Sequence, residues 1–98
     1  MNSSSLPDFN ELHSLRTWSL AEGFLEGVGR RAFFLIDAFP FMIIGEIVAV
    51  ESDFVLVCIE TTHVAELEGR VIRLHIDEIE AFFIEDGAHT IPRIRELP

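Results

Sequence analysis

The sequence has no lysine and no tyrosine, only one cysteine, and no long apolar run. A single cysteine excludes a disulfide within the chain. No apolar stretch approaches the ~20 residues that a membrane-spanning helix needs, so we expect no membrane span. The start of the chain, Met1 to Ser5, lacks the basic and apolar regions of a secretory signal. We therefore expect a cytoplasmic protein, one that can belong to a larger assembly.

The charge of the chain is strongly one-sided. All seven basic residues are arginine, and they face 17 acidic residues, so the net charge is −10. Most of the imbalance follows Arg31, where 13 acidic residues stand against four arginines. Proteins bind nucleic acid and anionic membranes largely through cationic side chains. The charge therefore argues against both partners and favours solubility.

Apolar residues make up 49% of the chain, and nine of them are phenylalanine. A domain of 98 residues has a large surface for its volume, so one small core cannot bury all of this apolar surface. We expect the excess to cover a partner, most simply a second copy of the chain. A homo-oligomer is therefore the expected state, and another protein partner stays open.

The pattern along the chain predicts one domain with a tail at each end. We assign residues 1–18 to an N-terminal tail, 19–87 to the domain, and 88–98 to a C-terminal tail that could cross a neighbouring subunit. Helical spacing of apolar residues predicts a short helix at Asp8 to Arg16 within the first tail. A second helix is expected over about 19–28, because Ser19 and Glu22 form a capping box and Gly29 fits a left-handed helix end.

Short β-branched and aromatic runs, bounded by turn residues, predict strands in the rest of the domain. The expected strands are 32–37, the two arms of a hairpin from Met42 to Glu60, 70–75 and 80–85. Gly45 and the acidic turn at Glu51 to Asp53 are the candidate points where the sheet bends. The predicted fold is mainly β, with an N-terminal helix followed by a five-stranded, strongly bent antiparallel sheet that forms a small barrel.

Four short motifs carry a resemblance to a known family. They are Gly29-x-x-Ala-Phe-Phe-Leu-Ile, Ile44-Gly45-x-Ile47-x-x-Val50, Asp53-Phe54-Val55-x-Val57 and Arg73-Leu74…Ile76-x-x-Ile79. Over about residues 19–85 the sequence resembles the Sm-like small β-barrels, which are SH3-like. It is also similar to small-barrel proteins associated with bacterial spore coats. The Sm resemblance implies an RNA-binding loop and, often, a ring in which the fourth strand of one subunit pairs with the fifth strand of its neighbour.

The sequence departs from the Sm pattern at the positions that bind RNA. Phe54 stands where the family usually has methionine, and Val55 stands where it usually has the asparagine that contacts a base. Arg73 matches the family's arginine, but Leu74 replaces the glycine that follows it. We therefore carry over the fold and not the RNA ligand. Phe54, Val55 and Arg73 stay the candidate positions for binding through the loops.

The residues that could support catalysis or metal binding do not form a recognised pattern. His75 and Asp77 share one face of an extended chain and are weak metal candidates, but no third ligand is evident nearby. Cys58 lies in a predicted strand, where a buried thiol behaves as a small hydrophobic group. Carboxylates cluster at turns and strand ends, and no nucleophile motif or phosphate-binding loop is present. We therefore expect no enzyme, no cofactor and no metal.

Aromatic residues provide the candidate contacts between subunits. Two phenylalanines around a proline, Phe39-Pro40-Phe41, are poorly explained by one small core, so we expect them to contact a partner. Phe82 and Ile84 on the last predicted strand are further candidates for an oligomer contact. Trp18 and the phenylalanines could instead line a ligand cavity, but core or interface positions are the favoured interpretation.

Three functions remain open from the sequence. The first is a non-enzymatic, self-associating small-barrel protein with a structural or scaffold role. The second is an Sm-type binding module that recognises RNA or a basic peptide through its loops. The third is a sensor of a small ligand or metal centred on His75. We favour the first, because the apolar excess needs a partner surface and the acidic charge opposes RNA.

Overall fold

The predicted β-rich runs form the strands of one antiparallel sheet. The computed structural model describes residues 19–93, so the helix expected at Asp8 to Arg16, and Trp18, lie outside the described residues. The strands are β1 (Arg31–Ile36), β2 (Met42–Glu51), β3 (Phe54–Thr62), β4 (Val71–His75) and β5 (Ile79–Ile84), with short 3-10 turns at η2 (Ala65–Leu67) and η3 (Ile76–Glu78). Each strand lies close to its expected bounds.

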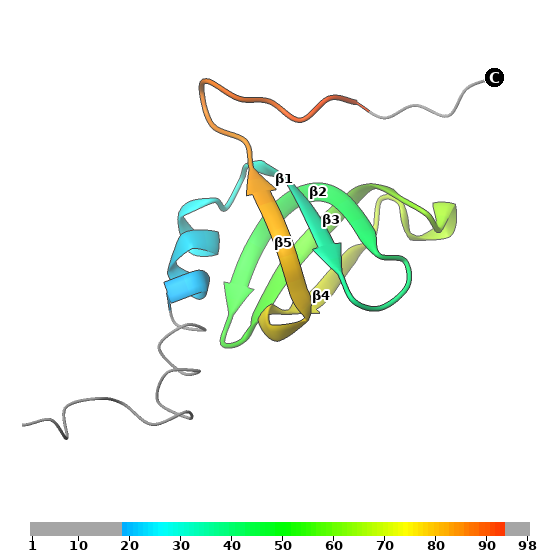
Figure 1. Cartoon of the computed structure of the whole chain (residues 1–98), viewed down its shortest axis with the longest axis horizontal. Coiled ribbons are helices and arrows are strands. Elements are labelled where there is room, and N and C mark those ends of the chain that lie inside the picture. The colour runs from blue at the N-terminus through cyan, green and yellow to red at the C-terminus, as the bar shows by residue number, and fades with distance from the viewer. Residues whose placement is uncertain (1–18, 94–98) are drawn as a thin grey trace, which may run out of the picture.

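The sheet is open. Its strand order is β4-β3-β2-β1-β5, and all neighbouring strands are antiparallel (Figure 1). The sequence predicted a barrel, and in this respect the prediction is wrong, because β4 pairs only with β3 and β5 pairs only with β1. Within residues 19–93, the fold is therefore a mainly β domain with one short helix and two free sheet edges.

Gly45 is required by the close approach of β2 and β3. The pairing register shifts between Ile44 and Gly45 and again between Ile47 and Ala49, and β2 curves across the sheet (Figure 1). A Cβ atom at position 45 would lie 2.3 Å from the carbonyl oxygen of Cys58, so no larger residue fits without a shift of the backbone. Irregularities of this kind bend a strand and increase its twist.

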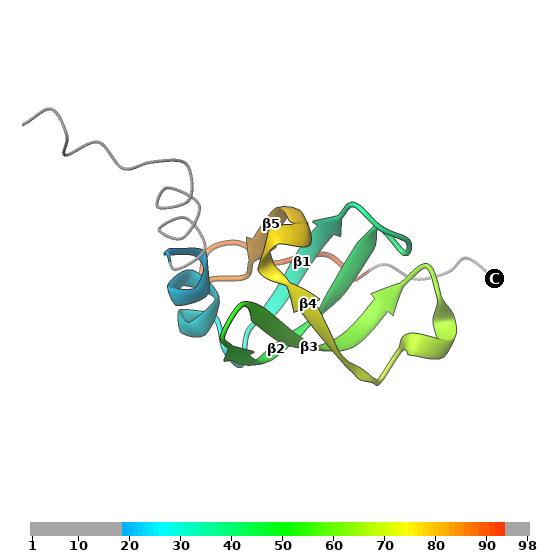
Figure 2. The same cartoon turned by 90° about the horizontal axis from the view of Figure 1, so that it is seen from below.

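One face of the sheet, the inner face, carries the main core. Residues 19–26 form a helix that lies beside the sheet (Figure 2). Its Phe24 is fully buried, with its ring centroid 5.9 Å from that of Phe34 and 4.6 Å from that of Phe82. Gly29 follows the helix with φ of 87°, which confirms the predicted left-handed residue after the helix.

The opposite face, the outer face, carries Arg31, Phe33 and Leu35, which alternate along β1 with the buried residues of the inner face. Ile44, the β2 partner of Phe33, is fully buried although it is not part of the main core cluster. The chain turns back after β5, and we call residues 86–93 the strap. Its Ile91 is 9% exposed, so the strap contributes a buried side chain of its own.

Candidate functional site

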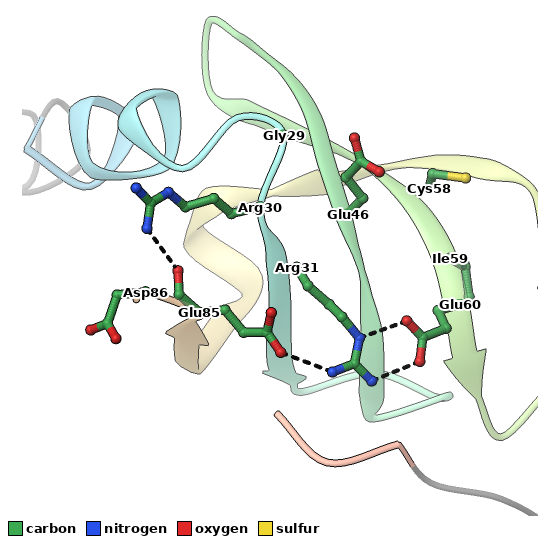
Figure 3. A pocket seen from close by; sticks show the side chains of 9 residues that line it. All are labelled: Gly29, Arg30, Arg31, Glu46, Cys58, Ile59, Glu60, Glu85 and Asp86. Carbon is green, nitrogen blue, oxygen red and sulfur yellow. Dashed lines mark hydrogen bonds and ion pairs between the residues drawn. The ribbon is translucent and has the colours of Figure 1, made fainter. Parts of the chain in front are cut away.

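A concave site lined by charged residues lies where the start of β1 meets β2, β3 and the end of β5. Its volume is about 520 Å³. The lining residues are Gly29, Arg30, Arg31, Glu46, Cys58, Ile59, Glu60, Glu85 and Asp86 (Figure 3). Four carboxylates and two guanidinium groups therefore share one open pocket, with the partly exposed thiol of Cys58 at its wall.

Arg31 is the centre of this site, because each of its guanidinium donors has an acceptor. Nε and Nη2 donate to the two carboxylate oxygens of Glu60 at 2.6 and 2.7 Å. Nη1 donates to Glu85 Oε2 at 2.9 Å and to the carbonyl oxygen of Ile91, and Nη2 also donates to the carbonyl oxygen of Pro92 at 3.3 Å. A guanidinium group has five N–H donors, so this one is fully paired. One side chain of β1 thus joins β3, the end of β5 and the strap.

The charges of the cluster stabilise one another. The side-chain hydrogen bonds from Arg31 are the main cause that lowers the pKa of Glu60. The hydrogen bond from the backbone N–H of Ile91 is the main cause that lowers the pKa of Glu85, and Arg31 adds to it. The Glu60 carboxylate in turn raises the pKa of Arg31 above its usual range. All three groups are therefore ionised at neutral pH.

A tight turn directs the strap back over the outer face. Asp86 Oδ1 accepts hydrogen bonds from the backbone N–H groups of Ala88 and His89 at 2.8 and 2.7 Å. These two bonds are the main cause that lowers the pKa of Asp86. The His89 ring lies edge-on to Phe83 at 6.4 Å, and Ile91 N donates to Glu85 Oε2 at 2.7 Å. The strap is thus held by side chains of β1 and by the end of β5.

The free energy that holds the strap is a small difference between comparable terms. Ordering His89 to Arg93 costs about 1–2 kcal/mol per residue in backbone entropy, roughly 5–10 kcal/mol together. Burial of one side chain, Ile91, and three hydrogen bonds to Arg31 and Glu85 offset this cost, and the bond to the Pro92 carbonyl oxygen is exposed. We therefore expect the strap to open locally while the sheet stays folded.

The structure brings Phe54, Arg73 and His75 together on β3 and β4. The Arg73 guanidinium carbon lies 4.3 Å from the Phe54 ring centroid, and the Phe54 and His75 rings lie 5.0 Å apart. Val55, the third position considered for binding through the loops, is fully buried in the core. Two of the three loop-binding candidates therefore form one surface cluster, and the third packs inside.

His75 and Asp77 form a local pair. His75 Nδ1 accepts a hydrogen bond from the backbone N–H of Asp77 at 3.1 Å and lies 3.9 Å from the Asp77 carboxylate. Within residues 19–93, no group of three or more His, Cys, Asp or Glu side chains is placed to hold a metal ion. The weak metal candidates of the sequence therefore lack a third ligand of these types in the described part of the chain.

The expected subunit-contact residues differ in their exposure. Phe39 and Phe41 are 65% and 49% exposed, and their rings meet edge-on at 5.7 Å, whereas Pro40 between them is buried. Phe82 is 42% exposed although one side of its ring packs on Phe24. Ile84 is half-buried and lies against the position of Gly27. The contact itself stays a prediction for all of them.

Sequence reasoning missed the cluster around Arg31. The sequence placed Arg31 at the start of a strand but assigned it no partner. Its partners are 29, 54 and 60 residues away along the chain, so no local spacing reveals them. The only available signal was an arginine at the start of a strongly apolar strand, where a cation needs a carboxylate partner if it is to be partly buried.

No protein-family model matches the chain, and no curated protein matches it either. Over the described residues, no helix is long and apolar enough to cross a membrane.

Proposed function

We propose that this chain is a non-enzymatic protein related to the Sm-like type but with an open five-stranded sheet, that it self-associates, and that it has a structural or scaffold role in a larger cytoplasmic assembly. The observation that supports the proposal best is the pair of free sheet edges, β4 and β5. Both edge strands carry exposed apolar side chains, with Val71 at 53%, Phe82 at 42% and Phe83 at 40%. Free edge strands can pair with another chain, because within residues 19–93 their backbone N–H and C=O groups lack a strand partner on one side.

The two edges match each other face by face. On β4, Ile72 and Leu74 pair with buried residues of β3 and so lie on the inner face, and Val71 and Arg73 lie on the outer face. On β5, the inner-face residues are Phe82 and Ile84, and the outer-face residues are Ala81 and Phe83. If β4 of one copy pairs with β5 of another, inner apolar residues meet inner ones and the core continues across the junction.

The charges beside the two edges are also complementary. Arg70 and Arg73 are exposed at β4, whereas Glu80 is exposed on β5 and Glu85 and Asp86 follow it. A side-chain hydrogen bond with Asp37, which follows β1, raises the pKa of Glu80. Opposite charge favours joining β4 to β5 over joining like edges. Contact between unlike edges is head-to-tail, and it builds either a closed ring or an open filament.

Substitution of one exposed edge residue tests this proposal. Val71→Lys places a charge on the free β4 edge, and we expect it to shift the protein to monomer in sedimentation velocity. Val48→Lys is the matched control, because Val48 is 43% exposed but belongs to β2 in the middle of the sheet. If both variants and the unchanged chain sediment alike, edge pairing is excluded.

Phe39 and Phe41 offer a second contact of the same assembly. Their exposed rings lie in the loop between β1 and β2, next to the register pair Leu35 and Met42. Replacing both with alanine removes this apolar surface without disturbing the core. We expect a smaller shift toward monomer than Val71→Lys produces, measured in the same sedimentation experiment.

One observation favours a second function, a binding module of Sm type. The Arg73 side chain stacked on Phe54 beside His75 offers a cation and an aromatic surface for an RNA base or a peptide. Isothermal titration with single-stranded RNA and with a basic peptide tests it. Salt-dependent binding that is lost in Phe54→Ala would favour this function over the scaffold.

A further inference from the structure

The outer face holds the strap through groups that specify one kind of segment. Arg31 binds two successive main-chain carbonyls, those of Ile91 and Pro92, and Glu85 accepts the N–H of Ile91. The only strap side chain that is buried is Ile91. Main-chain groups at fixed spacing together with one buried side chain are the way in which grooves recognise extended peptides. We call Arg31, Glu60 and Glu85 the strap site.

We propose that the strap site is a recognition site for an extended Ile-Pro segment, filled by the chain's own strap and exchanged with the strap of a second copy. A second copy offers the same main-chain groups and the same isoleucine, so every contact of the closed strap can form between copies. This proposal goes beyond edge pairing, because the strap site lies on the outer face and requires neither β4 nor the free side of β5.

The first part of the strap is suited to such an exchange. It consists of the exposed turn from Asp86 to His89, and its hydrogen bonds are open to solvent. Gly87 lies in this turn with no atom within 4 Å of the place a Cβ would occupy, so the turn is open at this position. Exchange of an identical segment re-forms the contacts of Ile91 and Pro92 with Arg31 and Glu85 between copies, and it needs only this turn to rearrange.

The charges around the site limit what else could fill it. Glu46, Glu60, Glu85 and Asp86 surround the two arginines, so the pocket has an excess of negative charge. Arg93, the last described strap residue, lowers the pKa of Glu60 by its charge. A segment with a cation directly after Ile-Pro therefore fits this pocket better than an acidic one. The strap itself, with Ile91, Pro92 and Arg93, meets that requirement.

A peptide with the sequence of the strap tests the recognition. The probe is acetyl-Ala-His-Thr-Ile-Pro-Arg-amide, and the protein is the full chain carrying Ile91→Asp, which removes the buried side chain of its own strap. We expect at least tenfold tighter binding to this variant than to the unchanged chain, where the strap competes. NMR shifts of the Arg31 side chain report the site. The same peptide with aspartate at the isoleucine position should not bind.

Two chains with complementary defects test the exchange. One chain carries Ile91→Asp and the other Arg31→Gln, and both carry Val71→Lys so that edge pairing cannot join them. We expect dimers by native mass spectrometry in the mixture and monomers in each chain alone. Failure of edge pairing would leave this result unchanged, so the two proposals are tested separately.

Binding and exchange are compared only among variants that are folded. The dispersion of the backbone amide signals of the sheet shows whether each variant is folded. If Arg31→Gln unfolds, two altered peptides serve as the controls in its place. One has alanine at the position of Pro92 and the other has aspartate at the position of Ile91, and neither changes the protein. A folded Ile91→Asp chain that does not bind the strap peptide, or that binds the aspartate peptide equally well, overturns recognition. A mixture that stays monomeric while the peptide binds overturns exchange.

Discussion

The two faces of this sheet are held together in different ways. The inner face is a continuous apolar core in which Phe24, Phe34 and Ile47 are fully buried. The outer face is held at one end by a single arginine with five acceptors and by one buried strap residue, Ile91. The same five strands therefore support one face stabilised by burial of apolar surface and another stabilised by directional contacts between charged groups.

This difference indicates how each face responds to change. Apolar burial is non-directional and depends little on pH, so damage to the inner face weakens the whole domain. The contacts of Arg31 are directional and need ionised carboxylates, so damage to them releases the strap and leaves the sheet in place. Four substitutions or conditions can test the comparison, beginning with the largest expected effect.

Truncation of Phe34 should damage the inner face most. Phe34 is fully buried against Phe24, so Phe34→Ala should lower the free energy of unfolding by about 3–5 kcal/mol. Leu35→Ala is the matched control, because the neighbouring side chain is 39% exposed on the outer face. Urea denaturation measures both. Equal losses for the two variants would contradict the assignment of the faces.

Substitution of Gly45 should also weaken the sheet. The added methyl group of Gly45→Ala would lie 2.3 Å from the Cys58 carbonyl oxygen, and relief of such overlap costs about 1–3 kcal/mol. Gly23→Ala is its control, since that position lies in the helix with no atom within 4 Å, and alanine there should stabilise by about 0.5–1 kcal/mol. Thermal melts should move in opposite directions for the two variants.

Loss of the Arg31 side chain should act on the strap alone. Arg31→Gln removes charged hydrogen bonds to Glu60, Glu85 and the strap carbonyls. It should therefore lower the free energy of strap opening by about 1–3 kcal/mol. Amide hydrogen exchange should show faster exchange at Ile91 and unchanged exchange in the middle of β2. Arg30→Gln is the control, because within residues 19–93 the Arg30 side chain makes one hydrogen bond, an exposed one to the Glu85 carbonyl oxygen. Loss of protection throughout β2 would contradict separate opening of the strap.

Acid should release the strap before it unfolds the sheet. The pKa values of Glu60 and Glu85 are lowered in the folded protein, so their stabilisation is complete above their ordinary values and is lost as pH falls through the lowered ones. Arg31 stays charged throughout this range. We therefore expect Ile91 exchange to accelerate below about pH 4.5, the ordinary value for glutamate. Exchange that does not change with pH, after correction for the intrinsic rate, would contradict the role of the carboxylates.

Much of the fold was predictable because its signals are local. The acidic turn before Phe54, the left-handed Gly29 and the β-branched runs are each visible within a few residues of sequence. The sequence identified Gly45 as a candidate bend point, but it did not predict that this position lies close to the Cys58 carbonyl oxygen. The open sheet was not predictable, because the same strands with a slightly different bend could close into a barrel.

The candidate site was largely hidden because its residues come from distant parts of the chain. Arg31, Glu60, Glu85 and Ile91 meet only after four strands have paired. The alternation of apolar residues predicts which face of a strand is buried, but it does not predict which carboxylate pairs with which arginine. The exposed Phe39 and Phe41 were easier to identify, because two aromatic residues around a proline exceed what a small core needs.

The proposed assembly depends on the free edges β4 and β5 joining copies of the chain. Native mass spectrometry of the unchanged chain over a series of concentrations tests it most directly. We expect either one closed oligomer or a series that grows by single subunits, since head-to-tail pairing leaves each added copy with a free edge. A monomer at every concentration would contradict it.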